Sequence, residues 1–299
     1  MSAGIAAEHP AGLIPATVGV APVAQPITRR RSILVWLSAG WLGLLVLVCL
    51  IAGFLPLPDY ANPVGFPRAT PSAGSVGEWF GLDSLGRSVL SRSAYGGRVS
   101  LLLGAVAGIT AMVVGVLLGL IAGYFRGIVD TLIMYLTDAL LAFPPLVLLL
   151  AISSILQPSF QTLLFGLTVL VIPTFVRLAR ANTLNWASRE FVLAARNMGA
   201  GRMRIAFREV LPNVLPSVMA YFPTVVAALI VAEGSLSFLG LGIPSPTPSW
   251  GGMIADGKDY ITNAPFLVFI PAGIIFLTVF ALNQVGDHAR KRFDRTAQD

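Results

Sequence analysis

Residues 99–124 read VSLLLGAVAGITAMVVGVLLGLIAGY, an unbroken run without a charged side chain. About 20 consecutive apolar residues are enough for a helix to cross the hydrocarbon core of a bilayer. The run therefore predicts a transmembrane helix at Val99–Tyr124. Glycines recur there at every fourth position, and such a strip of small residues lets another helix backbone approach closely. We expect this strip to pack against a neighbouring span; it consists of Gly115, Gly119, Gly123 and Gly127.

The composition of the whole chain also requires a membrane. Of the 299 residues, 56% are hydrophobic and 11% are charged, whereas soluble domains carry roughly a quarter charged residues. A soluble fold of this length could not bury so many apolar side chains. The sequence predicts an all-α integral membrane protein with about six transmembrane helices. The other expected spans are Ile33–Phe54, Ile128–Leu156, Gln161–Ala179, Val214–Leu239 and Phe266–Gly286.

The segments outside the spans differ in character. Residues 1–28 are rich in Ala, Pro and Gly without periodicity, which is typical of a disordered tail. Prolines make residues 55–80 irregular, and irregular backbone is tolerated outside the hydrocarbon. Ser84–Tyr95 reads as a short helix leading into the membrane. The expected units are a cytoplasmic tail at 1–28, a first span with an extracytoplasmic segment at 29–97, a five-helix transmembrane domain at 98–287 and a cytoplasmic tail at 288–299.

The distribution of basic residues predicts the orientation of the chain. With the N-terminus inside, fifteen of the 20 Lys and Arg residues fall in inner segments and five in outer segments. Cytoplasmic loops carry such an excess, so both termini are expected in the cytoplasm. The net charge of +6 is scattered over short segments rather than gathered on one face. This pattern argues against a nucleic-acid partner.

Two carboxylates fall inside predicted spans, Asp138 and Glu233. A charge near the bilayer centre costs roughly 2.5–3.5 kcal/mol, so such residues usually face a partner or a wet cavity. The alternative is a carboxylate held by a neighbouring group near a helix end. Pro144 and Pro145 interrupt the third span and predict a kink there. We take as pore or gating residues Asp138, Phe143, Pro144, Glu233 and Ser235.

The longest polar segment between spans, residues 186–213, predicts two short amphipathic helices. Ser188 is an expected N-cap, and Glu190 suits the first turn beside the helix dipole. Gly199 supplies the stop of the first helix. Its apolar stripe has helical spacing and consists of Phe191, Ala194, Ala195 and Met198. A second stripe follows before Pro212, the expected boundary of the fifth span: Met203, Ala206, Phe207, Val210 and Leu211.

An amphipathic helix on a loop could lie on the lipid surface, attracted by its arginines. The apolar face of the first helix, however, contains two alanines and ends in a glycine. Small residues suit close contact with protein, whereas lipid insertion is served better by bulky side chains. The composition therefore favours docking to another protein over adsorption to the bilayer.

The same loop resembles the EAA loop of ABC importer permeases. EFVLAARNMG at 190–199 and VLPNVLP at 210–216 follow that pattern, although Leu193 stands where the motif usually has its first Glu. Four further stretches resemble the C-type permeases of the dipeptide, oligopeptide and nickel family: GLDSLGRSVLSR at 81–92, DALLAFP at 138–144, AEGSLSFLGLG at 232–242 and PTPSWG at 246–251. The resemblance assigns ATPase coupling to Glu190, Phe191, Ala194, Ala195, Arg196, Met198, Gly199, Leu211 and Pro212.

The resemblance implies a type I ABC importer permease fold in a bacterial inner membrane. Its expected partners are a homologous second permease, two ABC ATPases, an extracytoplasmic substrate-binding protein and the lipid bilayer. ATP and Mg would be bound by the ATPases, with no cofactor in this chain. Consistent with this, neither Lys258 nor Lys291 lies in a phosphate-binding P-loop. The expected function is a pore-forming subunit that imports dipeptides or oligopeptides.

Two other classes of function were weighed. A secondary transporter driven by an ion gradient would use intramembrane carboxylates, with Asp138 and Glu233 as the residues available. An intramembrane enzyme is disfavoured because the two histidines, His9 and His288, lie in polar tails and no G-x-S-x-G motif occurs. We therefore expect no catalytic residue and no metal site in this chain.

Overall fold

The computed structural model describes residues 29–296, and the predicted tail at 1–28 lies outside them. Among the described residues the chain forms helices and no β-strand. In chain order the main helices are α1 (Arg29–Ile51), α2 (Val89–Phe125), α3 (Gly127–Ala142), α4 (Pro145–Ile155), α5 (Phe160–Ala187), α6 (Glu190–Asn197), α7 (Arg202–Arg204), α8 (Leu211–Phe238), α9 (Trp250–Gly257) and α10 (Phe266–Thr296).

Five helical stretches are long and apolar enough to cross a membrane, and the bent pair α3 and α4 makes six if it counts as one span. The prediction of about six transmembrane helices is confirmed. The third span is broken rather than kinked, because α3 and α4 meet at 88°. Phe143 and Pro144 lie in the break with extended backbone. A proline disfavours helical backbone at the residue before it, and here two prolines follow Phe143.

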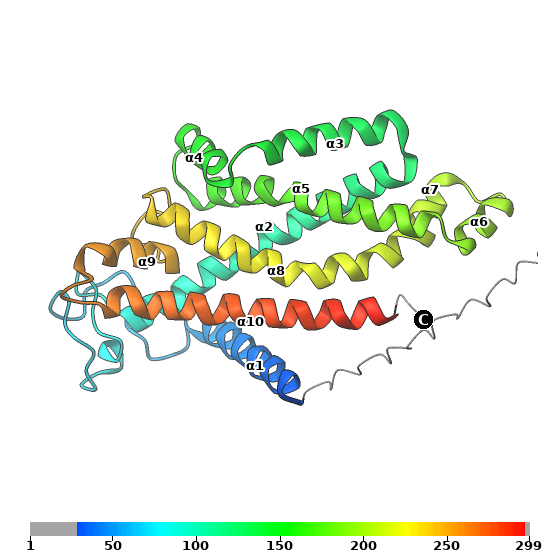
Figure 1. The fold of residues 1–299 in the computed structure, drawn as a ribbon. Helices are drawn as coiled ribbons and strands as arrows, with labels where there is room; N and C mark the ends of the chain where they lie inside the picture. Colours follow the sequence, from blue (N-terminus) through cyan, green and yellow to red (C-terminus); the bar gives the residue numbers. More distant parts are fainter. Residues whose placement is uncertain (1–28, 297–299) are drawn as a thin grey trace, which may run out of the picture.

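The helices share a common long axis with two distinct ends (Figure 1). One end carries α9 and the irregular segment between α1 and α2. The other end carries α6; in chain direction α1 runs away from this end and α10 runs toward it. The start of α1 and the end of α10 therefore point toward the end that carries α6, and the cytoplasmic location of both termini stays a prediction. We call these the α9 end and the α6 end.

Helix α2 packs most extensively against α5, and three of its glycines lie in the contact. A Cβ on Gly119 would lie 2.6 Å from the Val176 carbonyl oxygen, and one on Gly123 would lie 2.8 Å from Thr183 Cβ. A Cβ on Gly115 would overlap Phe175. Small residues thus let the two backbones approach, which is how helices associate in lipid.

Gly127 does not belong to this strip. It begins α3 with φ +64°, after α2 has ended at Phe125, and a Cβ there would meet nothing within 4 Å. Its spacing matched the strip, but a positive φ at a sharp turn is a different use of glycine. The prediction that Gly127 packs against a neighbouring span was wrong.

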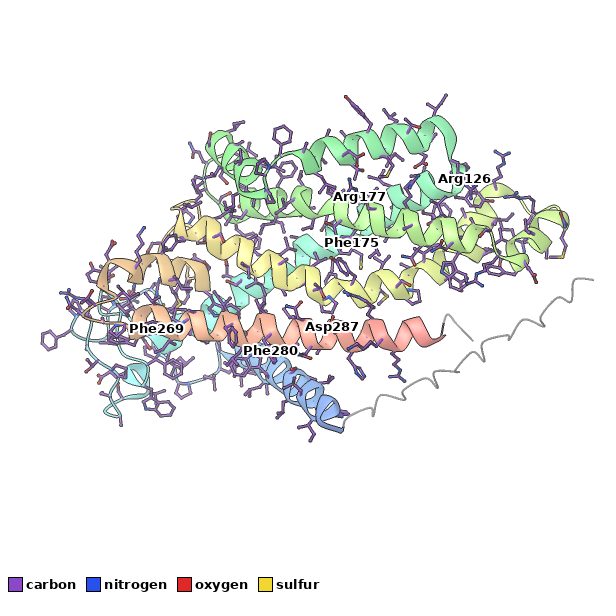
Figure 2. The ribbon with its side chains drawn as sticks, in the orientation of Figure 1. Arg126, Phe175, Arg177, Phe269, Phe280 and Asp287 are labelled. Atoms are coloured by element: carbon purple, nitrogen blue, oxygen red, sulfur yellow. The ribbon has the colours of Figure 1, made fainter. Side chains whose placement is uncertain are left out.

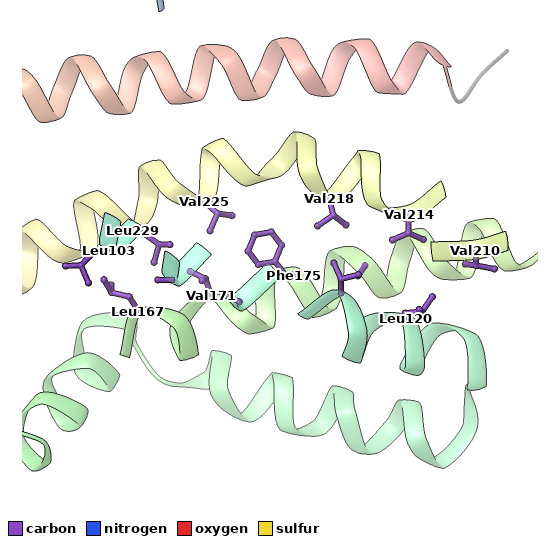
Figure 3. Close-up of a cluster of buried hydrophobic side chains, with 14 of the residues drawn as sticks. Leu103, Leu120, Leu167, Val171, Phe175, Val210, Val214, Val218, Val225 and Leu229 are labelled. Atoms are coloured by element: carbon purple, nitrogen blue, oxygen red, sulfur yellow. The ribbon is translucent and has the colours of Figure 1, made fainter. Parts of the chain in front are cut away.

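The largest core cluster lies between α2, α5 and α8 (Figure 3). Phe175 on α5 is fully buried at its centre, with Val218 and Val225 of α8 on one side. The cluster extends to the α6 end through Val192, Ile205 and Val210. One continuous core therefore joins the membrane helices to the α6 loop.

Helix α2 also begins earlier than expected. Ser88 accepts a hydrogen bond from the Ser91 backbone N–H and caps the helix, so Val89–Tyr95 is its first part. The predicted short helix at Ser84–Tyr95 is helical from Val89 onward and was wrong at 84–88. Residues before Ser88 form irregular structure fixed by side-chain contacts, which local periodicity does not encode.

Candidate functional site: the α6 loop and the α9 anchor

Helix α6 presents two different faces. Val192 and Ala195 are buried against the core of the same chain, while Leu193, Ala194 and Met198 are exposed at the tip. The predicted stripe is therefore divided, because Ala195 points inward and its other members outward. Phe191 is part-exposed, and its ring lies 6.2 Å from the ring of Trp186 on α5. The helix is fixed to its own subunit by one face and offers the other.

The two ends of α6 differ from each other. Its N-cap is Arg189, whereas Ser188 ends α5, so the expected Ser188 cap was wrong. At the other end, Gly199 has φ +80° and its N–H bonds to the Arg196 carbonyl at 3.0 Å. The Ala200 N–H bonds to the Ala195 carbonyl at 3.1 Å. This pair of bonds is the glycine-ended helix stop that the sequence predicts.

The second part of the loop continues into the membrane helix without a break. Arg202–Phe238 is helical throughout, with a π-helical turn at Ile205–Val210. The Leu211 N–H reaches back five residues to the Ala206 carbonyl. Pro212 follows at once, and the wider turn relieves the clash its ring would make with the carbonyl four residues earlier. Pro212 therefore lies within a continuous helix and does not mark a boundary.

The π turn also changes which side chains face inward. Ile205, Ala206 and Val210 are buried, whereas Met203 and Phe207 are exposed. The predicted second stripe was wrong at Met203, which precedes the π turn, and at Phe207, which lies within it. An extra residue in the turn shifts every later position around the helix axis.

At the far end of α8, Glu233 is a buried hydrogen-bond acceptor. Ser237 and Ser249 donate to its Oε1 at 2.7 and 2.8 Å, and Ser100 donates to its Oε2 at 3.1 Å. Ser249 also caps α9, where its Oγ accepts from the Gly252 N–H. The carboxylate therefore joins α2, α8 and α9. Hydrogen bonds to a charged group are among the stronger ones, so this contact fixes α9 to the end of α8.

Trp250 adds to this anchor. Its backbone N–H donates to Ser100 Oγ at 3.2 Å, and its indole N–H donates to the Ser93 carbonyl at 2.9 Å. The indole is fully buried against Val226 and Ile230. We call the residues Glu233, Ser100, Ser249 and Trp250 the α9 anchor.

A network of four charges lies beside the α9 anchor. Asp83 accepts from Arg87 Nε at 2.7 Å and lies 3.3 Å from Arg92 Nε. Asp256 on α9 lies 3.5 Å from Arg92 Nη2 and 4.0 Å from Arg87 Nη2. Partial burial raises the pKa of Asp256, while the two arginines act in the opposite direction. The network ties the segment before α2 to α9.

A different ion pair lies between α3 and α5. Arg177 Nη2 donates to Asp138 Oδ1 at 2.6 Å, with both side chains about half exposed. Figure 2 shows Arg177 on α5, in the space below α3. A second pair, Arg180 with Asp130, lies one turn closer to the α6 end at 2.5 Å. Of all α3 residues only Thr137 is buried, so these two pairs supply much of its contact with α5.

The predicted pore residues do not form one cluster. Asp138 and Glu233 belong to separate helices and separate hydrogen-bond networks. Phe143 is exposed in the break between α3 and α4. Ser235 is half-buried on α8, and its hydroxyl donates to the Val231 carbonyl of the same helix. Glu233 faces the interior of this chain, with 1% of its surface exposed.

The sequence pattern does not indicate the partners of these charges, which include Arg177, Ser249 and Arg92. Ser249 carried a local signal, because a serine directly before a short apolar helix is a typical N-cap. Arg177 carried none, since Asp138 lies 39 residues away in the chain. Arg92 joins the nearby Asp83 to Asp256, which lies 164 residues away. Among the described residues no group of carboxylate, histidine and cysteine side chains could hold a metal ion.

Comparison with known proteins matches the greater part of this chain. Residues 115–295 match the family described as "Binding-protein-dependent transport system inner membrane component". The "Glutathione transport system permease protein GsiD" of Escherichia coli O6:K15:H31 (strain 536 / UPEC) is 37% identical over 265 residues, 89% of this chain and 87% of the relative. The proteins of that name from Shigella boydii serotype 4 (strain Sb227) and Shigella dysenteriae serotype 1 (strain Sd197) are 37% and 36% identical over the same shares.

The matched region includes the α6 loop, the π turn and the whole α9 anchor except Ser100. The relatives are permease proteins, and the family is one of inner membrane components. Their membership in binding-protein-dependent systems implies binding-protein and ATPase partners. The chain therefore belongs to the binding-protein-dependent inner membrane components, as a permease subunit of an ABC importer of the peptide and nickel family.

Proposed function

We propose that this subunit forms one half of a translocation pore and converts the motion of an ATPase into movement of its own α9 end. The observation that carries the proposal is the uninterrupted helix Arg202–Phe238. Its 37 residues measure about 55 Å at 1.5 Å per residue. One end adjoins α6, and the other contains Glu233. A rigid displacement at α6 therefore reaches the α9 anchor through a single element.

The two faces of α6 suit such a role. Val192 and Ala195 seat the helix on the core, so it moves together with α5 and α8. Leu193, Ala194 and Met198 remain available to a partner. Helix α6 acts as the coupling helix, with its exposed face in a groove of the ATPase. The predicted coupling residues Glu190 and Arg196 are exposed on the same tip.

The complete transporter contains this subunit, a homologous second permease, two ATPases and an extracytoplasmic binding protein. The α6 end faces the cytoplasm, in agreement with the excess of basic residues in its loops. ATP and Mg bind to the ATPases. Differential binding of ATP to two arrangements of the ATPase pair shifts the pore between its two orientations.

The cargo is glutathione or a peptide of similar size. Support comes from relatives named as glutathione transport permeases that cover most of this chain. A secondary transporter is not favoured by any contact. Asp138 is paired with Arg177, and Glu233 accepts three hydrogen bonds.

The test is transport by the reconstituted complex. The subunit is co-expressed with its second permease, ATPases and binding protein, purified and placed in proteoliposomes. We expect the ATPases to co-purify and labelled glutathione or alanyl-alanine to accumulate only with ATP and binding protein. Accumulation driven by a proton or sodium gradient, with this chain alone, would overturn the proposal.

A further inference from the structure

A cavity of about 520 Å³ opens at the α9 end. It lies between the turn joining α4 to α5, the end of α8 and one face of α9, with Gln157, Gly240, Ile243 and Ala255 in its wall. Sites for small molecules occupy roughly 300–1,000 Å³. A peptide of two or three residues fits within that range. We call this space the α8–α9 cavity.

Two opposite charges lie in the wall of this cavity, Asp256 and Lys258. Each is held in place by other groups. Asp256 Oδ2 lies 3.5 Å from Arg92, and the Lys258 ammonium lies 5.2 Å from the centre of the Phe238 ring. About half of the Asp256 side chain remains exposed, and Lys258 is exposed too. Both charges are therefore oriented and still accessible to a ligand.

The charge balance favours a particular ligand. Asp256 also faces Arg87 and Arg92, but neither arginine lines the cavity, so Asp256 and Lys258 are the two charges of its wall. A molecule with both an ammonium and a carboxylate complements these two charges. Dipeptides and glutathione both carry this pair of groups.

We propose that the α8–α9 cavity binds the charged backbone of the imported peptide, its ammonium at Asp256 and a carboxylate at Lys258. The proposal rests on the proposed function, because it takes short peptides as the cargo. Ser237 also lines the cavity and donates to Glu233. A bound peptide therefore lies next to the α9 anchor, at the far end of the helix that begins beside α6.

The test is direct binding to the purified complex of permeases and ATPases without the binding protein. Saturation-transfer NMR gives the dissociation constant of glutathione. Lys258→Gln removes one charge. We expect the dissociation constant of glutathione to rise about tenfold, which corresponds to the loss of one charge-assisted hydrogen bond. Ala255→Trp fills the cavity and is expected to abolish binding. The matched control is Asp259→Asn, an exposed carboxylate next to Lys258 that does not line the cavity.

A chemical change in the ligand isolates the second contact. N-acetylation of glutathione removes its ammonium and is expected to weaken binding to the wild-type complex but not to Asp256→Asn. Equal binding by wild type, Lys258→Gln and Ala255→Trp, or no binding by wild type, overturns the proposal. ATP-driven uptake by the same wild-type complex with its binding protein is measured separately. Uptake without cavity binding refutes this inference alone, and absent uptake refutes the proposed function.

Discussion

Ser249 both caps α9 and donates a hydrogen bond to Glu233 on α8, at 2.8 Å. One hydroxyl thus fixes the start of a surface helix to the end of a membrane helix. The two residues are 16 positions apart, with an irregular turn between them. Because Glu233 also accepts from Ser100 on α2, three elements meet at one buried carboxylate.

Replacing the carboxylate by an amide should loosen this junction. In Glu233→Gln the new NH₂ group cannot accept the hydrogen bonds that the serines donate, and a buried polar group without its partner costs about 1–3 kcal/mol. We expect a lower melting temperature of the purified complex, measured by intrinsic fluorescence. The control is Ser235→Ala on the same helix, a half-buried residue whose hydroxyl donates to a carbonyl of its own helix. Equal melting temperatures would contradict a stabilising anchor.

A single methyl group should separate α2 from α5. Gly119→Ala places a Cβ 2.6 Å from the Val176 carbonyl and 2.7 Å from Ala179 Cβ. Overpacking of this kind costs about 1–3 kcal/mol. Gly273→Ala makes the same change on α10, where nothing lies within 4 Å. We expect the first variant alone to lose folded protein in size-exclusion chromatography, and similar profiles would refute the close approach.

Adjacent alanines on α6 should behave differently. Ala194→Arg places a large charge on the exposed face and is expected to prevent co-purification of the ATPase while the subunit stays folded. Ala195→Arg forces the same side chain into a position that is 8% exposed, so it should lower the melting temperature of the subunit itself. Co-purification and thermal unfolding are measured on both. Normal ATPase binding by Ala194→Arg would contradict the docking face.

The folding of the subunit should depend on the presence of both charges of the Asp138–Arg177 pair. Loss of one partner leaves a charge at membrane depth, at a cost of roughly 2.5–3.5 kcal/mol. We expect Asp138→Leu and Arg177→Leu each to reduce the amount of folded protein, and the exchange Asp138→Arg with Arg177→Asp to restore much of it. Failure of the exchange, with normal levels in both single variants, would show that the pair does not hold α3 against α5.

The sequence was sufficient for features that repeat locally and insufficient for contacts between distant segments. Apolar runs predicted the spans, and Gly199 predicted the end of α6. The π turn could not be predicted, because Pro212 looks the same before a helix boundary and inside a wide turn. The inward face of α6 could not be predicted from the sequence either. Contacts with the core bury Val192 and Ala195, whereas the predicted stripe contained Ala195 but not Val192.

The Glu233 site shows the same limit more clearly. The position of Glu233 in an apolar run predicts a carboxylate that needs a partner. The sequence left open whether that partner is water in a cavity or a neighbouring side chain. Ser100 lies 133 residues away. No periodic pattern connects the two, so only the packed structure assigns the hydroxyls to the carboxylate.

In the proposed mechanism the helix Arg202–Phe238 transmits motion as a rigid body. Arg208 and Glu209 lie within its π turn and are not buried, so they can be changed without altering the core. Two glycines there weaken the helix by about 2 kcal/mol relative to two alanines, which remove the same side chains.

The measurement is glutathione imported per ATP hydrolysed in proteoliposomes that contain the complete transporter. The pair Arg208→Ala and Glu209→Ala should keep the wild-type ratio. The transporter with Arg208→Gly and Glu209→Gly should still hydrolyse ATP but import at least severalfold less glutathione per ATP. The same ratio in both pairs, with intact assembly, would contradict transmission through this helix.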